Sequence, residues 1–136
     1  RVAVIGGGLT GVASAEYLLG RGHEVFIVEM LDWIMSDGNI VEKRTLTQEL
    51  SERGVLILVQ TKAEAITGRG VVLSRGGERE VAPADSVVFA VGVRSDRDLL
   101  TRLDIDRLEV HVIGDAQSPR RIMNALLEGA TVGRQI

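Results

Sequence analysis

Three glycines near the amino terminus and one acid after them are spaced to bind a dinucleotide. Gly6, Gly8 and Gly11 fit the pattern G-x-G-x-x-G. In that pattern the first glycine permits a tight turn, the second lets the backbone approach a pyrophosphate, and the third lets a helix pack closely on a strand. Glu29 follows about 20 residues later, where an acid reaches the ribose hydroxyls of an adenosine.

The segment that joins these residues also offers donors for an anion. A helix is expected to begin at Thr10, and the first N–H groups of a helix have no partner within it. Together with the partial positive charge of the helix start, they favour a phosphate group. We therefore place the pyrophosphate on the glycine turn and the ribose on Glu29. The predicted cofactor-binding residues of this motif are Gly6, Gly8, Leu9, Thr10, Gly11, Glu29 and Met30.

The charges near Glu29 bear on which dinucleotide binds. An acid at the end of the second strand accepts hydrogen bonds from ribose hydroxyls and repels a 2′-phosphate. Asp32 adds a second negative charge, and no cation follows Glu29 before Lys43. We therefore predict NAD(H) or an ADP moiety rather than NADP(H). FAD also ends in an adenosine and can use the same glycine pattern, so the motif leaves an FAD-binding domain open.

The elements that must hold this motif follow from short apolar runs separated by glycines. Strands that are apolar throughout are typical of a parallel sheet covered on both faces, and the helical segments carry apolar residues at helical spacing. The expected strands are residues 1–5, 23–28, 55–59 and 85–91, and the expected helices are residues 10–20 and 39–53. This order predicts an α/β fold with a Rossmann-like parallel sheet flanked by helices.

Between residues 63 and 81 the pattern changes to short runs that are split by glycine turns. The turns are Gly68-Arg69-Gly70 and Arg75-Gly76-Gly77, and their spacing is that of β-hairpins. We expect a small antiparallel β-meander, inserted before the strand that leads to Gly92.

The last third of the chain has a different character. Residues 93–109 are charged and weakly patterned, and we expect a solvated connection there. A short strand is expected over residues 110–113, just before Gly114 and Asp115. Ser118 as N-cap and Pro119 at the first helical position predict a helix start, and the helix is expected over residues 122–134.

Composition excludes several kinds of partner and site. The 136 residues carry a net charge of −3 with no basic stripe, so nucleic-acid binding has little support. The absence of cysteine excludes disulfides, thiolate nucleophiles and Fe–S ligands within this chain. No apolar run reaches the roughly 20 residues of a membrane span, and we expect no signal peptide. We expect no membrane partner, a cytoplasmic location, no metal site and no self-contained catalytic constellation.

Several segments resemble a known superfamily. The glycine turn, Glu29, the predicted meander and residues 85–94 resemble the NAD(H)-binding domain of two-dinucleotide-domain flavoproteins, the pyridine nucleotide-disulfide oxidoreductase-like superfamily. Val112-Ile113-Gly114-Asp115-Ala116 and Ser118-Pro119-Arg120-Arg121-Ile122 are similar to the carboxyl-terminal region of NADH:flavin oxidoreductases related to old yellow enzyme. That group includes 2,4-dienoyl-CoA reductase and trimethylamine dehydrogenase. The resemblance covers nearly the whole chain.

The resemblance implies that this chain is part of an NADH-dependent flavin oxidoreductase. Gly92 would lie beside NAD(H), and Gly114 and Asp115 would contact the flavin side of FAD, which only the parent protein would hold. Residues 1–92 would form the NAD(H)-binding domain. Residues 93–136 would form a connection, a Gly-Asp strand and a helix on the flavin-domain side. The implied partner is the parent's flavin-binding domain, and an exposed docking face for it would favour self-association.

Three further observations bear on this interpretation: one concerns the start of the chain, and two are departures from the pattern of the superfamily. The chain begins at Arg1, directly in its first strand, so we expect either a piece of a longer protein or a chain that lacks disordered ends. Reductases of this superfamily often have Glu two residues after the third glycine, where this chain has Ala13. They often read Gly-x-x-Pro-Asn where this chain reads Gly92-Val93-Arg94-Ser95-Asp96. Ala13 favours the alternative of a non-catalytic module that binds ADP or NAD for structure or regulation.

Overall fold

The computed structural model describes residues 1–36, 38–104 and 107–136 of the chain. Asp37, Ile105 and Asp106, which fall in stretches expected to be loop or connection, lie outside the described residues. The chain divides into two compact units, Arg1–Gly92 and Val93–Ile136. Each unit is described by itself below.

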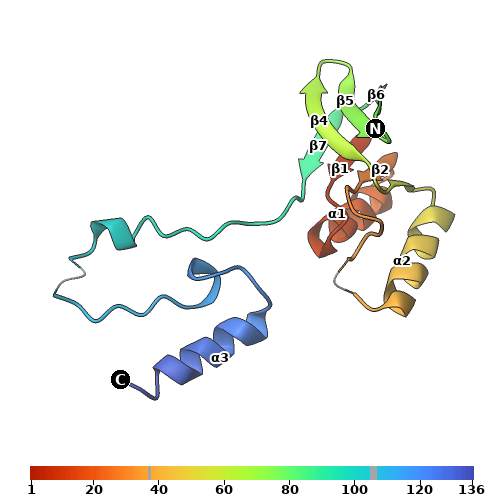
Figure 1. Ribbon diagram of the computed structural model, residues 1–136. Coiled ribbons are helices and arrows are strands. Elements are labelled where there is room, and N and C mark those ends of the chain that lie inside the picture. Colours follow the sequence, from red (N-terminus) through yellow and green to blue (C-terminus); the bar gives the residue numbers. More distant parts are fainter. Residues whose placement is uncertain (37, 105–106) are drawn as a thin grey trace. The chain divides into compact units, whose positions relative to one another are not determined.

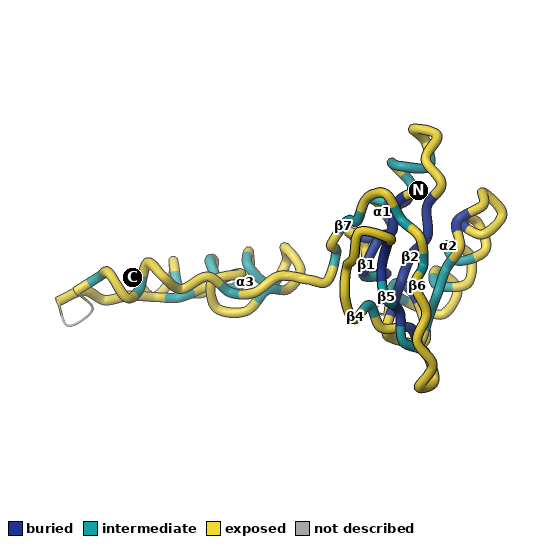
Figure 2. Tube along the Cα trace, turned by 90° about the horizontal axis from the view of Figure 1, so that it is seen from above, coloured by how far each residue is buried: buried dark blue, intermediate teal, exposed yellow. Residues whose placement is uncertain are grey.

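The first unit is built on a four-stranded parallel sheet, as predicted. Its order is β3-β2-β1-β7, so β1 (Val2–Ile5) lies between β2 (Val25–Val28) and β7 (Ser86–Phe89), with β3 (Leu56–Leu58) at one edge. All eight residues of β1 and β2 are buried (Figure 2). Because the strands are parallel, the loops after β1, β2 and β7 open at one end of the sheet.

Two helices cover one face of this sheet. Helix α1 (Leu9–Gly20) and helix α2 (Ile40–Glu52) pack through Val12, Ala15 and Leu50 against the β1 and β2 side chains Val4 and Ile27. The helix start expected at residue 39 is explained by a capping box. The Asn39 side chain accepts hydrogen bonds from the N–H groups of Val41 and Glu42, each at 3.0 Å, and the Glu42 carboxylate accepts from the Asn39 N–H at 3.1 Å.

The predicted meander covers the opposite face. Strands β4 (Lys62–Thr67), β5 (Gly70–Arg75) and β6 (Glu78–Ala82) form an antiparallel sheet in the order β4-β5-β6 (Figure 1). Val71 and Leu73 of β5 pack against Phe26 and Val28 of β2, the alternate residues to those that face the helices. The α/β class, the parallel sheet and the meander are therefore confirmed.

The second unit departs from the sequence prediction at two places. It contains the short 3-10 turns η1 (Leu100–Arg102) and η2 (Gly114–Ala116) and the helix α3 (Ile122–Val132). The prediction of a strand over residues 110–113 is wrong, because this segment forms no strand in the structure. The described part of the unit holds no other strand with which it could pair. The Gly-Asp strand of the predicted domain division is therefore a Gly-Asp turn.

The helix start predicted at Ser118 and Pro119 is also wrong. The N–H of Ser118 donates to the carbonyl oxygen of Gly114 at 3.0 Å, so Ser118 closes the η2 turn instead of capping a helix. The chain then has no regular secondary structure as far as Arg121, which is the N-cap of α3. None of the helices among the described residues combines the length and the apolar character that crossing a membrane requires.

Candidate dinucleotide-binding site

A groove opens where the loops after β1, β2 and β7 meet. Its volume is about 570 Å³. Seven of the predicted cofactor-binding residues line it: Gly6, Gly8, Leu9, Thr10, Glu29, Met30 and Gly92. The fold thus brings together residues from three loops that are far apart in the sequence.

The three glycines of the motif occupy different surroundings in the structure. Gly6 has a φ of +104°, and a Cβ there would collide with the carbonyl oxygen of Ala90. A Cβ on Gly11 would collide with the carbonyl oxygen of Gly6, which explains why α1 can start so close to β1. Gly8 is different, because no atom of the described residues beyond Gly8 and its two chain neighbours lies within 4 Å of the position that its Cβ would take. Gly6 and Gly11 are required by the protein's own packing, and Gly8 leaves space at the groove.

The start of α1 faces this space with unpaired donors. Gly8 is the N-cap, and among the described residues no side chain caps the first turn, which also contains no acid. The first N–H groups of a helix lack intrahelical partners and carry partial positive charge. Leu9 and Thr10 line the groove at this point. This arrangement suits a phosphate group.

Glu29 lies at the end of β2 and is only 8% exposed. Its Oε2 atom accepts a hydrogen bond from the Gly7 N–H at 2.7 Å, and its Oε1 atom accepts one from the Leu31 N–H at 2.8 Å. A carboxylate oxygen can accept two hydrogen bonds. Each Glu29 oxygen therefore keeps one acceptor position that a ribose hydroxyl could use.

Gly7, the middle residue of the glycine run, has a role that sequence reasoning missed. A Cβ on Gly7 would lie 2.6 Å from the Cγ2 atom of Ile34 and 3.2 Å from the Glu29 Oε2 atom. Its carbonyl oxygen also accepts a hydrogen bond from the Met35 N–H at 2.7 Å. The available signal was the glycine at the middle position of the run, because the pattern G-x-G does not require glycine there. That glycine permits the close contact between the turn and the loop after β2.

The loop between β3 and β4 forms a wall of the groove that sequence reasoning also missed. The Thr61 N–H donates to the carbonyl oxygen of Glu29, and the Gln60 N–H donates to that of Leu31, both at 2.9 Å. These bonds place Thr61, Lys62 and Ala63 on the groove. The pairing joins segments about 30 residues apart, so no local pattern could have revealed it.

The structure corrects the charge count made around Glu29. The Asp32 Oδ1 atom accepts a hydrogen bond from the Gln60 side-chain amide at 3.0 Å. Asp32 lines a separate hollow, with Trp33 and Ile34, and is not among the residues of the groove. The second acid that we expected to disfavour a 2′-phosphate therefore does not line the groove.

Gly92 and the end of β7 form the far side of the groove. Ala90, Val91 and Gly92 line it, and Gly92 has a φ of +94°. The Ala90 N–H donates to the carbonyl oxygen of Ile5 at 2.8 Å, which holds this segment beside the glycine turn.

The other two predicted site residues, Gly114 and Asp115, belong to the second unit. Gly114 has a φ of +61°, and its N–H donates to the Glu128 Oε2 atom at 2.7 Å. The Arg120 guanidinium pairs with the other oxygen of Glu128, and the Arg120 N–H donates to the Asp115 Oδ1 atom at 3.4 Å. The Gly114 hydrogen bond, and after it Arg120, lower the pKa of Glu128. Glu128, which sequence reasoning missed, thus holds the Gly-Asp turn as a carboxylate.

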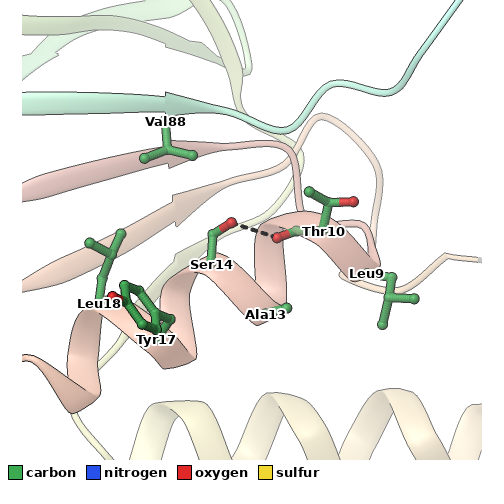
Figure 3. Close-up of a pocket in the computed structure, with 7 residues that line it drawn as sticks. All are labelled: Leu9, Thr10, Ala13, Ser14, Tyr17, Leu18 and Val88. Carbon is green, nitrogen blue, oxygen red and sulfur yellow. Dashed lines mark hydrogen bonds between the residues drawn. The ribbon is translucent and has the colours of Figure 1, made fainter.

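A second hollow lies beside α1, next to the edge strand β7 (Figure 3). Its volume is about 590 Å³, and its lining is mostly apolar. Six of its residues come from α1 and one from β7: Leu9, Thr10, Ala13, Ser14, Tyr17, Leu18 and Val88. Ala13, the position where reductases of the superfamily often have Glu, therefore lines this hollow and is not among the residues of the groove.

Two relatives of similar sequence are much longer than this chain. Cinnamate reductase of Clostridium sporogenes is 32% identical over the whole chain, which spans 21% of that protein. NADH oxidase of Thermoanaerobacter brockii is 34% identical over 99% of the chain, again 21% of that protein. The chain thus spans about a fifth of the length of these relatives.

Structural comparison and a family model agree with these relatives. In the solved structure of a 2-naphthoyl-CoA reductase, 28% identical, 99% of this chain superposes on 21% of that chain with a TM-score of 0.85. Histamine dehydrogenase from Rhizobium is 22% identical and shares the fold, with a TM-score of 0.88. The match covers all of this chain and 23% of the histamine dehydrogenase chain. The family model for pyridine nucleotide-disulphide oxidoreductases matches residues 1–118. The chain therefore belongs to the pyridine nucleotide-disulphide oxidoreductase family.

Proposed function

We propose that the first unit binds NAD(H) and positions it for hydride exchange with a flavin held outside this chain. The observation that carries the proposal is the open space at Gly8, which lies beside the unpaired start of α1 and shares its groove with Glu29. These are the two features that the pyrophosphate and the adenosine ribose of a dinucleotide require.

The contribution of this chain is binding and orientation. The first-turn N–H groups near Leu9 and Thr10 would bind the pyrophosphate, and the free acceptor positions of Glu29 would bind ribose hydroxyls. The far wall, from Ala90 to Gly92, would lie against the rest of the cofactor. The nicotinamide itself supplies the hydride chemistry when it is bound.

The partner of this reaction would be the flavin-binding domain of a longer protein. The names of the relatives, a cinnamate reductase and an NADH oxidase, support an oxidoreductase of this kind. Gly114 and Asp115 would belong to the flavin side, as the resemblance implies. The α3 side chains Ile122, Met123, Leu126 and Leu127 are more than half exposed, and they offer an apolar surface for docking or for self-association.

A second candidate function is supported by Ala13. Without an acid at this position, the unit could bind ADP or NAD for structure or regulation and take no part in hydride transfer. An FAD-binding domain is the third candidate.

Spectroscopy and rapid kinetics on the flavin-containing full-length protein separate these candidates. The proposal predicts that NADH bleaches the flavin absorbance near 450 nm, roughly one flavin reduced per NADH oxidised. Tight NADH binding without flavin reduction would favour the non-catalytic module. A yellow first unit, purified with one bound flavin, would favour the FAD domain.

A further inference from the structure

The groove is lined by a positively charged side chain, that of Lys62, whose position there cannot be predicted from the sequence. Lys62 is the first residue of β4 and lines the groove together with Glu29 and Thr61. The hydrogen bond from the Thr61 N–H to the Glu29 carbonyl oxygen, at 2.9 Å, fixes the start of β4 beside the end of β2. Lys62 therefore lies at the end of the groove that Glu29 marks as the adenosine end.

Lys62 has no competing partner in the described part of the chain. It is exposed, and no carboxylate of the described residues forms an ion pair with it. Its flexible four-carbon side chain can adjust to the position of a bound group. A lysine of this kind binds a phosphate as a compact positive charge.

The opposing negative charge is smaller than the sequence suggested. Glu29 and Lys62 are the only charged residues among the described residues that line the groove. Asp32 is hydrogen-bonded to Gln60 and does not line it. Both oxygens of Glu29 already accept a backbone N–H, which compensates part of their charge. The charged side chains of the groove therefore sum to zero, where the sequence predicted two unopposed acids.

We infer that Lys62 determines nucleotide specificity, because its ammonium group pairs with the 2′-phosphate of NADP(H) and lets the groove bind NADPH as well as NADH. The inference rests on the proposed function, since it takes the adenosine ribose to lie at Glu29. Glu29 still repels the 2′-phosphate, so NADPH binds more weakly than NADH. Lys62 is the residue that keeps this binding measurable.

The test is calorimetric titration of the full chain with NADPH and with NADH, at low and at high salt. The variants are Lys62→Ala and Lys62→Arg, with Lys43→Ala as the matched control. Lys43 is the only other lysine of the sequence, and it lies on α2 and does not line the groove. Lys43→Ala therefore changes the net charge by the same amount as Lys62→Ala without changing the groove. Thermal unfolding checks that each variant is folded.

We expect Lys62→Ala to weaken NADPH binding by about tenfold or more, the loss of a charge-assisted contact. NADH binding should change by less than about threefold, since NADH lacks the 2′-phosphate. Lys62→Arg should retain NADPH binding and Lys43→Ala should leave both affinities unchanged. High salt should weaken NADPH binding more in the wild type than in Lys62→Ala, because the contact is exposed to solvent.

Three results would overturn the inference. They are a wild type that binds NADH without detectable NADPH binding, a Lys62→Ala variant that loses both nucleotides equally, and an equal loss in Lys43→Ala. A wild type that binds neither nucleotide would instead overturn the proposed function, and this inference with it.

Discussion

At the residue scale, Glu29 combines a predicted role in binding with an observed role in the structure, and sequence spacing alone does not separate the two. It is predicted to bind ribose, and in the structure its carboxylate already holds the glycine turn through the Gly7 N–H and the following loop through the Leu31 N–H. The Gly7 hydrogen bond is buried and the Leu31 hydrogen bond is partly buried. Replacement of Glu29 should therefore change stability as well as binding.

Glu29→Ala should weaken NADH binding by about 1.5–3 kcal/mol, the usual contribution of hydrogen bonds to a charged group. The free energy of unfolding should fall by about 1–3 kcal/mol, because two backbone N–H groups lose their acceptor. Calorimetry with NADH and urea unfolding measure the two effects. Glu49→Ala, an exposed position on α2, is the control and should change neither. NADH affinity that is unchanged in Glu29→Ala would refute the ribose assignment.

The sequence predicted the site residues that lie next to the motif and missed those that tertiary pairing brings to it. Gly6, Gly8 and Glu29 follow a local pattern that the physics of a phosphate-binding turn dictates. Thr61 and Lys62 reach the groove only because the loop before β4 pairs with the loop after β2. No spacing rule predicts where the Asp32 side chain lies, because its position depends on a hydrogen bond from the Gln60 side chain.

At the element scale, the success of a prediction depended on whether an element carries its own signals. The start of α2 has such a signal, because Asn39 and Glu42 form a reciprocal capping box. The strands of the parallel sheet were identified by apolar runs that two covering layers require. Residues 110–113 have the same apolar character, but a strand also needs a neighbour, and the described part of the second unit offers none.

The capping box gives a prediction about the stability of α2. Asn39→Ala should lower the free energy of unfolding by about 1 kcal/mol, since two N–H groups at the helix start lose their acceptor. Urea unfolding measures this change. Arg44→Ala, an exposed site in the same helix, should leave stability within about 0.5 kcal/mol of the wild type. NADH affinity should stay the same in both variants, because neither residue lines the groove. An unchanged stability in Asn39→Ala would show that the cap contributes nothing to the folded state.

At the scale of the whole molecule, the two units differ in what holds them together. All of the buried hydrophobic residues among those described lie in the first unit, and all of them except Val2 form two clusters on the two faces of the parallel sheet. The described part of the second unit has no buried residue, and charged side chains hold its turn. Arg97 donates to the carbonyl oxygens of Ala116 and Gln117 at 2.9 and 2.6 Å, and Glu128 accepts from the Gly114 N–H.

This difference predicts that the first unit folds without the second. A chain of residues 1–92 should unfold cooperatively in urea, and should bind NADH with a Kd within about twofold of the full chain, because its core and groove are complete. Residues 93–136 alone should show no cooperative transition, since they bury too little apolar surface to offset chain entropy. Circular dichroism and calorimetry measure these properties. A chain of residues 1–92 that is unfolded, or has lost NADH binding, would contradict the division into an NAD(H)-binding domain and a flavin-side segment.

The central claim is that the space beside Gly8 holds the pyrophosphate of NAD(H). Gly8 has a φ of −71°, so valine fits its backbone, and no atom of the described residues beyond its chain neighbours lies within 4 Å of the added Cβ. Gly68, in the turn between β4 and β5, is equally open and does not line the groove, which makes Gly68→Val the matched control. Calorimetric titration with NADH should show binding to the wild type and to Gly68→Val, and none to a Gly8→Val variant of unchanged thermal stability. Equal NADH affinity in all three proteins would contradict the claim.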